Sequence, residues 1–472
     1  MLDKQLIDKI LTEALSTGGD FAEIFVEKKS SSNLFMIDGK VESSISGRDF
    51  GIGIRIFKGL FSVYGYTNDM NEESLLKATK KIASSISGTK EDITINLIKQ
   101  DIENINKIQI YPQDIKKSEK IELMKIASHS AKDYDKHISQ VRVSLGDVKQ
   151  NILIANSEGL FTTDERVRGR ISIESVATDG NDMQTGRVSP GASAGFEFFR
   201  NMDIEAEARE ASRIAKTMLF ASYAPSGKFP VVIDNRFGGV IFHEACGHGL
   251  EASSVAKGNS IFAGKMGQMI ASPLVSAVDD GTLPNEWGSL TIDDEGHKTQ
   301  RNLLIENGIL KGYLVDKLNG RRMGIKSTGS GRRESYKYAP TSRMTNTFIL
   351  NGKSSFDEII KNTEYGIYAK NMGGGSVNPA TGDFNFAVME GYIIRNGKIC
   401  EPVRGATLIG NGGEVLKKID MVGNNLGFGQ GMCGSSSGSI PTNVGEPTIR
   451  VSEITVGAVS YTHLTLPTTS RV

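Results

Sequence analysis

The stretch Val240-Ile-Phe-His-Glu-Ala-Cys-Gly-His-Gly-Leu-Glu251 carries two of the six histidines of this 472-residue chain, five positions apart, with a glutamate directly after the first. Neutral imidazole is a good zinc ligand, and a nearby carboxylate can take the proton of a water that the metal activates. The pattern therefore predicts a hydrolytic metal site in which His243 and His248 are ligands and Glu244 is the general base.

The spacing of the two histidines differs from the familiar H-E-x-x-H form, in which they share one helix face. At about 100° per residue, His243 and His248 would point roughly 140° apart on an ideal helix. They can share a metal only if the helix is locally distorted, for instance by a π-bulge. Gly247 and Gly249 would make such a distortion less costly. We therefore predict a distorted turn between the two histidines.

A catalytic zinc site usually has three protein ligands, so a third is expected from elsewhere in the chain. Cys246 is interpreted as a small buried core residue, and Cys400, at the end of a strand, as a structural one. Cys433 differs, because it lies in a glycine-rich segment, 427–438, that we expect to be a loop able to fold around a ligand. His297 is a further candidate, and the acidic run 293–295 could orient a ligand histidine, although a plain acidic turn is the favoured interpretation.

Composition gives no indication of a nucleic-acid-binding, membrane-spanning or secreted protein. Lys+Arg and Asp+Glu both total 55, so net charge gives no argument for a nucleic-acid or anionic-membrane partner. The alternating arginines of 166–170 are interpreted as a solvated sheet face. Three cysteines, no secretory signal at the amino end and no apolar run of about 20 residues predict a soluble cytoplasmic protein.

Periodicity predicts an α+β fold. An amino-terminal mixed α/β domain, residues 1–222, would contain antiparallel strands, and Asp38-Gly39 marks a tight hairpin between two of them. Its helices and short strands are expected at 3–16, 71–86, 117–133 and 204–219, and at 21–26, 34–37, 41–45, 51–57, 61–66, 138–145, 151–155, 159–163, 170–177 and 191–199.

The second half is richer in glycine and short strands, with Asn307-Gly308 and Asn396-Gly397 as further turns. This pattern predicts a β-rich, barrel-like domain over 223–458 that carries the metal-site helix. Residues 459–472 match nothing in the preceding pattern and are interpreted as a disordered or extraneous tail.

Several motifs together make the chain resemble the TldD/PmbA metallopeptidases, historically labelled modulators of DNA gyrase, and most closely the TldD branch. The likeness is dense in the second half. It rests on His243–Glu251, Ile292–Gly296, Asn307–Lys317, Gly331–Tyr336, Arg343–Thr347, Glu364–Tyr368, Gly373–Gly375 and Gly405–Gly410.

The resemblance implies that His243, His248 and Cys433 hold one zinc ion per chain and that Glu244 is the general base. It also implies unfolded peptide substrates, as in leader-peptide removal or antitoxin degradation, and a metal-free PmbA/TldE-type paralogue as heterodimer partner. A homodimer stays open. The chain departs from the family pattern at two places: Cys246 stands where an aliphatic residue is expected, and after Cys433 the chain has Ser435-Ser-Ser-Gly438 where the family usually has a lysine and a glutamine.

Substrate-binding residues are less strongly indicated. Arg332 and Tyr336 are chemically suitable donors to a substrate, and Gly373 and Gly374 belong to a shared glycine run. The alternative function is a non-proteolytic, gyrase-associated regulatory protein with a structural metal, which would need a closed site with four protein ligands. A cysteine hydrolase using Cys246 and His248 is disfavoured, because these side chains point roughly 160° apart on a helix.

Overall fold

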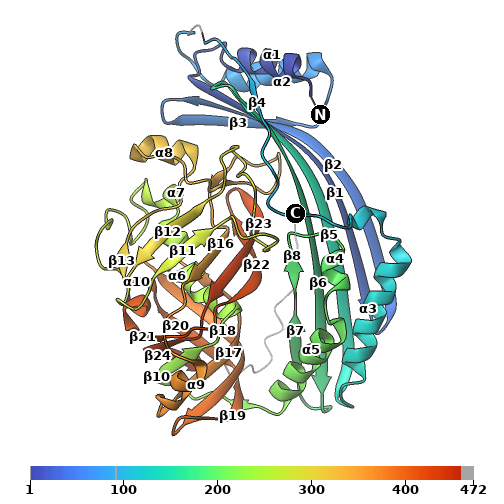
Figure 1. Cartoon of the computed structure of the whole chain (residues 1–472), viewed down its shortest axis with the longest axis vertical. Coiled ribbons are helices and arrows are strands. Elements are labelled where there is room, and N and C mark those ends of the chain that lie inside the picture. Colours follow the sequence, from blue (N-terminus) through green and yellow to red (C-terminus); the bar gives the residue numbers. More distant parts are fainter. Residues whose placement is uncertain (1, 91–92, 459–472) are drawn as a thin grey trace.

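A computed structural model describes residues 2–90 and 93–458. It has two regions of different architecture, a long curved sheet and a compact β-rich body (Figure 1). The predicted tail, 459–472, lies outside the described residues. Within them, no helix is both long enough and apolar enough to span a bilayer.

The amino-terminal region is built on an eight-stranded sheet of order β3-β2-β1-β5-β6-β4, with β7 and β8 also paired to β6. Its strands are β1 (Phe21–Ile37), β2 (Lys40–Lys58), β3 (Phe61–Thr67), β4 (Ile98–Gln100), β5 (Ile138–Asn156), β6 (Leu160–Thr178), β7 (Met183–Val188) and β8 (Gly191–Ala192). Four of them, β1, β2, β5 and β6, are 17 to 19 residues long.

The prediction of separate short strands is therefore wrong for this sheet. Polar segments such as Ser30–Ser32 suggest breaks in the sequence, but there β1 is paired with β2 on one side and β5 on the other. Backbone hydrogen bonds on both sides hold a polar segment extended, because strand propensity is weaker than the pairing context.

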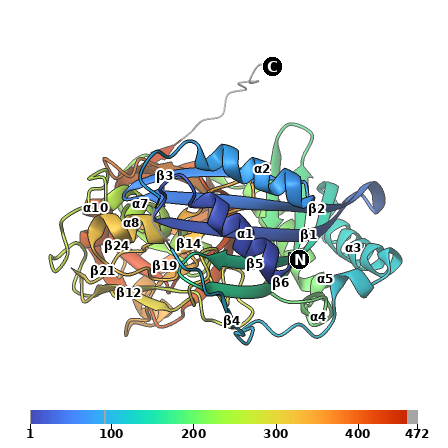
Figure 2. The same cartoon turned by 90° about the horizontal axis from the view of Figure 1, so that it is seen from above.

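Helices cover the two ends of this sheet in separate clusters. α1 (Lys4–Ala14) and α2 (Glu72–Ala83) pack together at one end, and α3 (Lys117–Lys132) and α5 (Ile204–Leu219) pack at the other, near the short α4 (Glu197–Arg200) (Figure 2). Side chains of Asp3, Asn71 and Asp203 accept hydrogen bonds from first-turn amides of α1, α2 and α5. Each of these three helices begins within one residue of its expected start.

The carboxyl-terminal region contains the predicted barrel. β17 pairs with both β10 and β18 in the order β17-β10-β24-β20-β18, which closes five strands on themselves. They are β10 (Gly227–Ile233), β17 (Tyr365–Val377), β18 (Asp383–Arg395), β20 (Ala406–Asn411) and β24 (Ile449–Ala458). The strands β9 (Ser222–Tyr223), β19 (Lys398–Arg404) and β21 (Ile419–Val422) extend the same sheet.

A six-stranded sheet of order β13-β12-β11-β16-β23-β22 lies beside the barrel. Its strands are β11 (Ala277–Asp280), β12 (Arg301–Glu306), β13 (Ile309–Leu310), β16 (Asn346–Ile349), β22 (Gly427–Ser435) and β23 (Gly438–Glu446), and β14 (Gly331–Arg332) pairs separately with β15 (Thr341–Ser342). The short helices are α6 (Val240–Ala245), α7 (Ala252–Val255), α8 (Lys317–Met323), α9 (Phe356–Lys361), α10 (Gly412–Val415), and the 3-10 turns η1 (Pro112–Asp114), η2 (Phe237–Gly239), η3 (Gly247–Leu250) and η4 (Leu416–Lys418).

All three predicted tight turns are present. Asp38, Asn307 and Asn396 each have a positive φ, of 45°, 48° and 50°, and the glycine after each is positive as well. Two successive left-handed residues form the turn that suits the twist of antiparallel strands, so these dipeptides set the β1–β2, β12–β13 and β18–β19 hairpins.

Buried ion pairs join the two regions. Arg55 of β2 binds Glu23 at 2.9 Å and Glu295 at 2.6 Å, and Arg166 of β6 binds Asp294 at 2.6 Å. The interpretation of 166–170 as a solvated face is therefore wrong, because this face of β6 lies against the carboxyl-terminal region. The division at residue 222 stays a proposal; α5 ends at Leu219 and the first strand of the barrel sheet begins at Ser222.

Candidate metal centre

The predicted distortion between the two histidines is present. α6 ends at Ala245, Cys246 leaves helical geometry with φ −127° and ψ −51°, and the tighter turn η3 follows. The distortion is thus a helix end followed by a 3-10 turn and not a π-bulge. As a result the imidazole rings of His243 and His248 face each other edge to face, with centroids 5.0 Å apart.

Cys433 meets both histidines from a distant part of the chain. Its Sγ lies 3.4 Å from Nε2 of His243 and 3.2 Å from Nε2 of His248. The expectation of a loop here is wrong, because Cys433 lies in β22, which pairs with β23 along its whole length. A strand fixes the position of the thiol more firmly than a glycine-rich loop would.

The glycines of the motif serve packing. A Cβ on Gly247 would lie 2.2 Å from Sδ of Met344, and one on Gly249 would lie 2.7 Å from the ring of Phe262. Neither glycine has a positive φ. They are therefore required because neighbouring side chains approach the backbone of the turn closely, and backbone freedom is not the reason.

The donor set fits a zinc ion. Zinc ligands at about 2.3 Å for sulfur and about 2.0 Å for nitrogen lie roughly 3.5 Å apart in a tetrahedral site, close to the two nitrogen–sulfur distances here. Burial raises the pKa of the Cys433 thiol, but the charges and hydrogen bonds of His243 and His248 outweigh it and lower that pKa to about 3. The sulfur is therefore in the thiolate form that binds metal.

Glu251 is a part of this centre that the sequence reasoning missed. Its Oε2 lies 3.2 Å from Nδ1 of His248, so the carboxylate holds the imidazole with Nε2 directed at Cys433. The available signal was its position three residues after His248. Nδ1 of His243 is buried without a hydrogen-bond partner, so only one of the two imidazoles has such an acceptor.

Arg343 connects the two halves of the centre and was also missed. It is fully buried, and its Nε lies 3.8 Å from Oε1 of Glu251. The same guanidinium donates to the carbonyl oxygen of Cys433, to Oγ of Ser437 at 2.8 Å and to the carbonyl oxygen of Gly438 at 3.0 Å. One side chain thus links the acceptor of His248 to the β22–β23 hairpin.

Glu244 lies beside the candidate ligands with a carboxylate that remains accessible. Its Oε2 is 3.7 Å from Nε2 of His248, and its side chain is 22% exposed. Cys246 faces the other way and is fully buried in the apolar core, which raises the pKa of its thiol. It is a core cysteine, as predicted, while Cys400 is exposed on β19.

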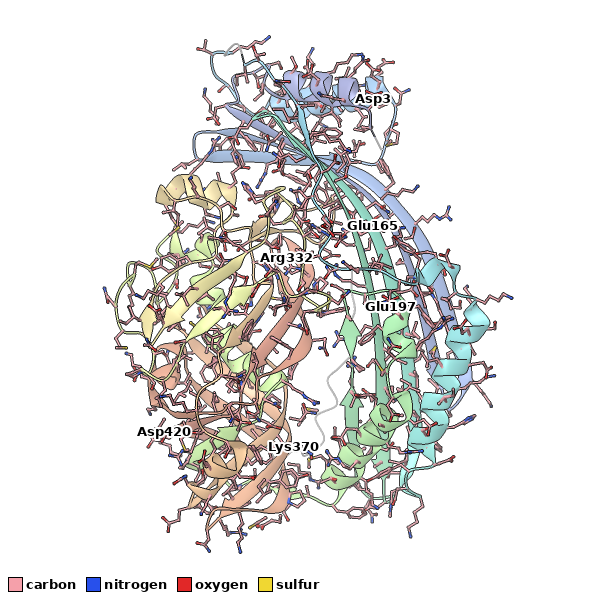
Figure 3. All side chains as sticks on the ribbon, viewed as in Figure 1. Asp3, Glu165, Glu197, Arg332, Lys370 and Asp420 are labelled. Carbon is pink, nitrogen blue, oxygen red and sulfur yellow. The ribbon has the colours of Figure 1, made fainter. Side chains whose placement is uncertain are left out.

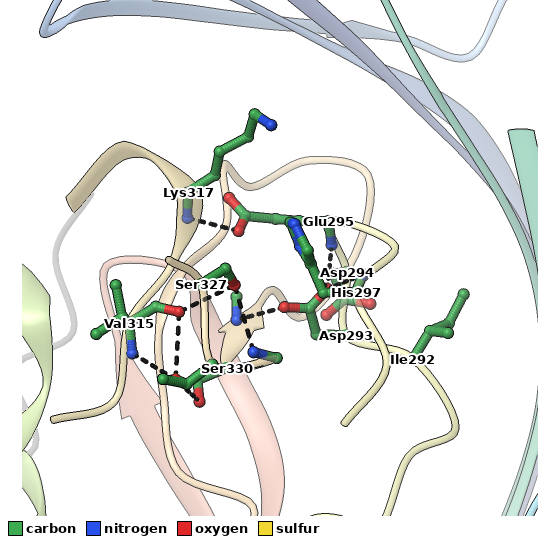
Figure 4. Close-up of polar contacts among 12 residues, drawn as sticks. Ile292, Asp293, Asp294, Glu295, His297, Val315, Lys317, Ser327 and Ser330 are labelled. Carbon is green, nitrogen blue, oxygen red and sulfur yellow. Dashed lines mark hydrogen bonds and ion pairs between the residues drawn. The ribbon is translucent and has the colours of Figure 1, made fainter. Parts of the chain in front are cut away.

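Asp293, Glu295 and His297 form a second group of close polar side chains, shown in Figure 4. Their oxygens already have partners: Asp293 accepts from the amides of Glu295, His297 and Gly331, and Glu295 accepts from Arg55 and the amide of Lys317. The favoured interpretation of a structural acidic turn agrees with these contacts, and none of them reaches His243 or His248.

The candidate substrate residues come from two parts of the chain, the segment of β14 and the loop after it, and β17. Arg332 is 2% exposed and donates to the carbonyl oxygens of Met344 and Pro441. Tyr336 is 3% exposed and packs against Gly51 of β2. Gly373 and Gly374 lie where the register between β17 and β18 shifts. Their roles in substrate binding stay predictions.

Family models cover most of the described chain. The model of the PmbA/TldA metallopeptidase C-terminal domain matches residues 226–458, that of the central domain 110–219, and that of domain 1 matches 22–86. The chain belongs to the PmbA/TldA metallopeptidase family. The candidate metal centre therefore lies in the part of the chain that the C-terminal domain model matches.

Relatives and solved structures agree with this membership. A metalloprotease TldD homolog of Buchnera aphidicola is 40% identical over 447 residues, 93% of this chain and 92% of the relative, and one of Haemophilus influenzae is 39% identical over 93% of each. A structure from Thermotoga maritima, titled as a modulator of DNA gyrase, has a TM-score of 0.78 at 22% identity and covers 96% of this chain and 100% of its own. TldE of Thermococcus kodakarensis has a TM-score of 0.75 at 19% identity, with the same coverage. The two structures support the fold alone.

Proposed function

We propose that this PmbA/TldA family member is a zinc-dependent peptidase that hydrolyses unfolded peptides, with one zinc ion held by His243, His248 and Cys433. The observation that carries the proposal is the convergence of two Nε2 atoms on one Sγ, at 3.4 and 3.2 Å, from residues 190 and 185 positions apart in sequence. Among the described residues, 2–90 and 93–458, three side chains offer a ligand atom at this point: His243, His248 and Cys433. Three protein ligands leave a position open, as in catalytic sites and unlike closed structural ones.

Glu244 is proposed as the general base. Zinc, when bound, lowers the pKa of water and polarises a carbonyl group. A carboxylate oxygen of Glu244 takes the proton of the attacking water and delivers it to the nitrogen of the leaving amine. Its position next to His243 and its partial exposure support this role. A general base at this point must reach both the attacking water and the nitrogen of the leaving amine.

The substrate is proposed to bind in an extended form along a sheet edge. β22, the strand that carries Cys433, is the edge strand of the six-stranded sheet. Main-chain pairing with an edge recognises an extended backbone and not a particular sequence, so it favours unfolded peptides. Leader-peptide removal and degradation of antitoxins are the proposed roles, with the cytoplasm as the place of action.

A metal-free PmbA/TldE-type paralogue is the proposed partner, and a homodimer is the alternative. The similarity of fold to TldE of Thermococcus kodakarensis supports the pairing of two chains of one architecture. Size-exclusion chromatography of the chain alone and with a co-expressed paralogue distinguishes these two assemblies.

The test compares metal content with cleavage of an unstructured peptide. We expect about one zinc per chain, the content for one three-ligand site, in the wild type and in Glu244→Gln, but cleavage only in the wild type. Cys433→Ala should lose both the zinc and the cleavage, whereas Cys400→Ala, an exposed cysteine, should retain both. Cleavage at the wild-type rate by Glu244→Gln would refute the base assignment. Zinc binding without cleavage, with and without a paralogue, would favour the regulatory alternative.

A further inference from the structure

Three arginines of β6 lie on the face that meets the carboxyl-terminal region. Arg166, Arg168 and Arg170 alternate along the strand and so point to the same side. We call the boundary between β6 and the carboxyl-terminal region the seam. The outer two arginines have partners across it: Arg166 donates to Asp294 at 2.6 Å and to the carbonyl oxygen of Ile292 at 2.9 Å, and Arg170 donates to the carbonyl oxygen of Gln430 at 2.9 Å. The middle arginine therefore also faces this seam.

Arg168 has no such partner. In the described part of the chain no hydrogen bond or ion pair joins its side chain to another residue. Its Nε is shielded from solvent, whereas the residue as a whole is only partly buried. Asp294 and Asp164 are near enough to act on it, but both carboxylates are already bound by Arg166. A desolvated cation without an anion is unfavourable, so the site lacks one negative group.

The surrounding charges reinforce this deficit. Burial, together with the positive charges of Arg166 and Arg332, lowers the pKa of Arg168 to about 9. The guanidinium therefore still carries its charge at neutral pH. An arriving anion would relieve both the burial of that charge and its repulsion by two like charges.

The seam runs alongside the metal centre. Gln430, the contact of Arg170, precedes Cys433 by three residues on β22, about 10 Å along a strand. Arg332 donates to the carbonyl oxygen of Pro441, and Pro441 is paired with Met432, the neighbour of Cys433. Figure 3 marks Arg332 on the carboxyl-terminal side of this seam and Glu165 on β6 opposite. Arg168 thus lies on the β6 side of the strand along which the peptide is proposed to bind.

We propose that Arg168 binds a carboxylate of the peptide substrate, from an acidic side chain or from the peptide's C-terminus. This inference rests on the proposed function and adds a substrate preference to it. A guanidinium can donate two parallel hydrogen bonds to a carboxylate, which supplies both affinity and orientation. Main-chain pairing by itself would leave the enzyme without such a preference.

Binding can be measured separately from cleavage, by fluorescence anisotropy of labelled unstructured peptides on zinc-loaded Glu244→Gln protein. The first peptide is neutral and has an amidated C-terminus, and the second differs only in its free C-terminal carboxylate. In a series of further amidated peptides, one aspartate is placed at successive positions, and the peptide with asparagine at the same position is the control. We expect the peptide with a carboxylate at one position to bind about tenfold more tightly than its neutral counterpart, a difference of about 1.4 kcal/mol in binding free energy. The peptide that shows the gain identifies the source of the carboxylate.

Variants assign this preference to Arg168. Arg168→Gln should abolish the preference for the carboxylate peptide, so that it binds about as tightly as the neutral peptide, whose affinity should not change. Arg168→Lys should retain part of the preference. Arg209→Gln, which removes a charge from the exposed face of α5, should keep the preference. An unchanged preference in Arg168→Gln, no preference in the parent protein, or no peptide binding would each overturn the inference. Carboxylate-dependent binding by a wild type that cuts nothing would refute the peptidase proposal alone.

Stability gives an independent readout. Because Arg168 has no partner, Arg168→Met should leave the melting temperature unchanged or raise it, whereas Arg166→Met should lower it by breaking buried pairs. A fall for Arg168→Met as large as that for Arg166→Met would show that Arg168 is a structural residue and would overturn the inference.

Discussion

Oε2 of Glu251 lies 3.2 Å from Nδ1 of His248, so the carboxylate fixes the ring whose other nitrogen lies 3.2 Å from the sulfur of Cys433. An acceptor behind a ligand histidine sets its orientation and raises its basicity as a ligand. This short local contact accounts for how a residue on the 3-10 turn after α6 is held toward a thiol on β22.

Replacement of this acceptor should weaken zinc binding without unfolding the protein. Glu251→Gln keeps the shape but loses the charge, and we expect zinc affinity to fall about 10- to 100-fold. Competition with a chromophoric zinc chelator measures the change. Glu306→Gln, at an exposed position of β12, is the control and should bind zinc like the wild type. Equal affinity in Glu251→Gln would show that the contact has no effect on the metal.

Loss of Arg343 should affect stability as well as metal binding. Arg343→Met removes donors to Cys433, Ser437 and Gly438 and leaves their buried oxygens unpaired, so we expect the free energy of unfolding to fall by about 3 kcal/mol. Denaturant titration of the metal-free protein measures this loss. The added stability that zinc confers should also shrink, because β22 is no longer tied to Glu251. Arg333 is another buried arginine and provides the control. Arg333→Met should destabilise the protein, but zinc should still add as much stability as it adds to the wild type.

A methyl group on the turn between the histidines should be poorly tolerated. Gly247→Ala would place Cβ 2.2 Å from Sδ of Met344, and overpacking of this kind costs about 1 to 3 kcal/mol. Thermal denaturation of the metal-free protein tests this. In a Met344→Ala background the same substitution should cost less, because the obstructing atom is gone. Gly374→Ala meets nothing within 4 Å and is the control for the substitution itself.

One histidine outside the metal centre should make stability depend on pH. Burial lowers the pKa of His297, but the carboxylate of Asp293, whose Oδ1 lies 3.8 Å from Nδ1 of the imidazole, outweighs it and raises that pKa from 6.5 to about 9. The pair therefore stabilises the fold fully below pH 6.5, and this contribution is lost as pH rises through about 9. His297→Gln should be less stable than the wild type at pH 6, and the difference should disappear near pH 10. A difference that is constant over this range would contradict the prediction.

Local signals in the sequence were sufficient for several features. A helix was predicted over 204–219, which is the range of α5, and Asp38-Gly39 predicted the first hairpin. Capping, periodicity and left-handed turn residues depend on neighbours only a few positions away. The predicted strand lengths were wrong because strand pairing depends on residues far away in the sequence. The polar middle of β1 stays extended because β2 and β5 pair with it on either side.

By itself the sequence determined which residues have side chains suited to a metal site, namely His243, Glu244 and His248, and that an ideal helix could not bring the two imidazoles together. Only the tertiary structure decided that Cys433 meets them from a strand, that Glu251 and Arg343 tie these parts together, and that Arg168 faces the seam without a partner. The physical reason is that ligand identity belongs to a side chain, whereas convergence, burial and pairing depend on how elements some 190 residues apart in the chain pack against each other.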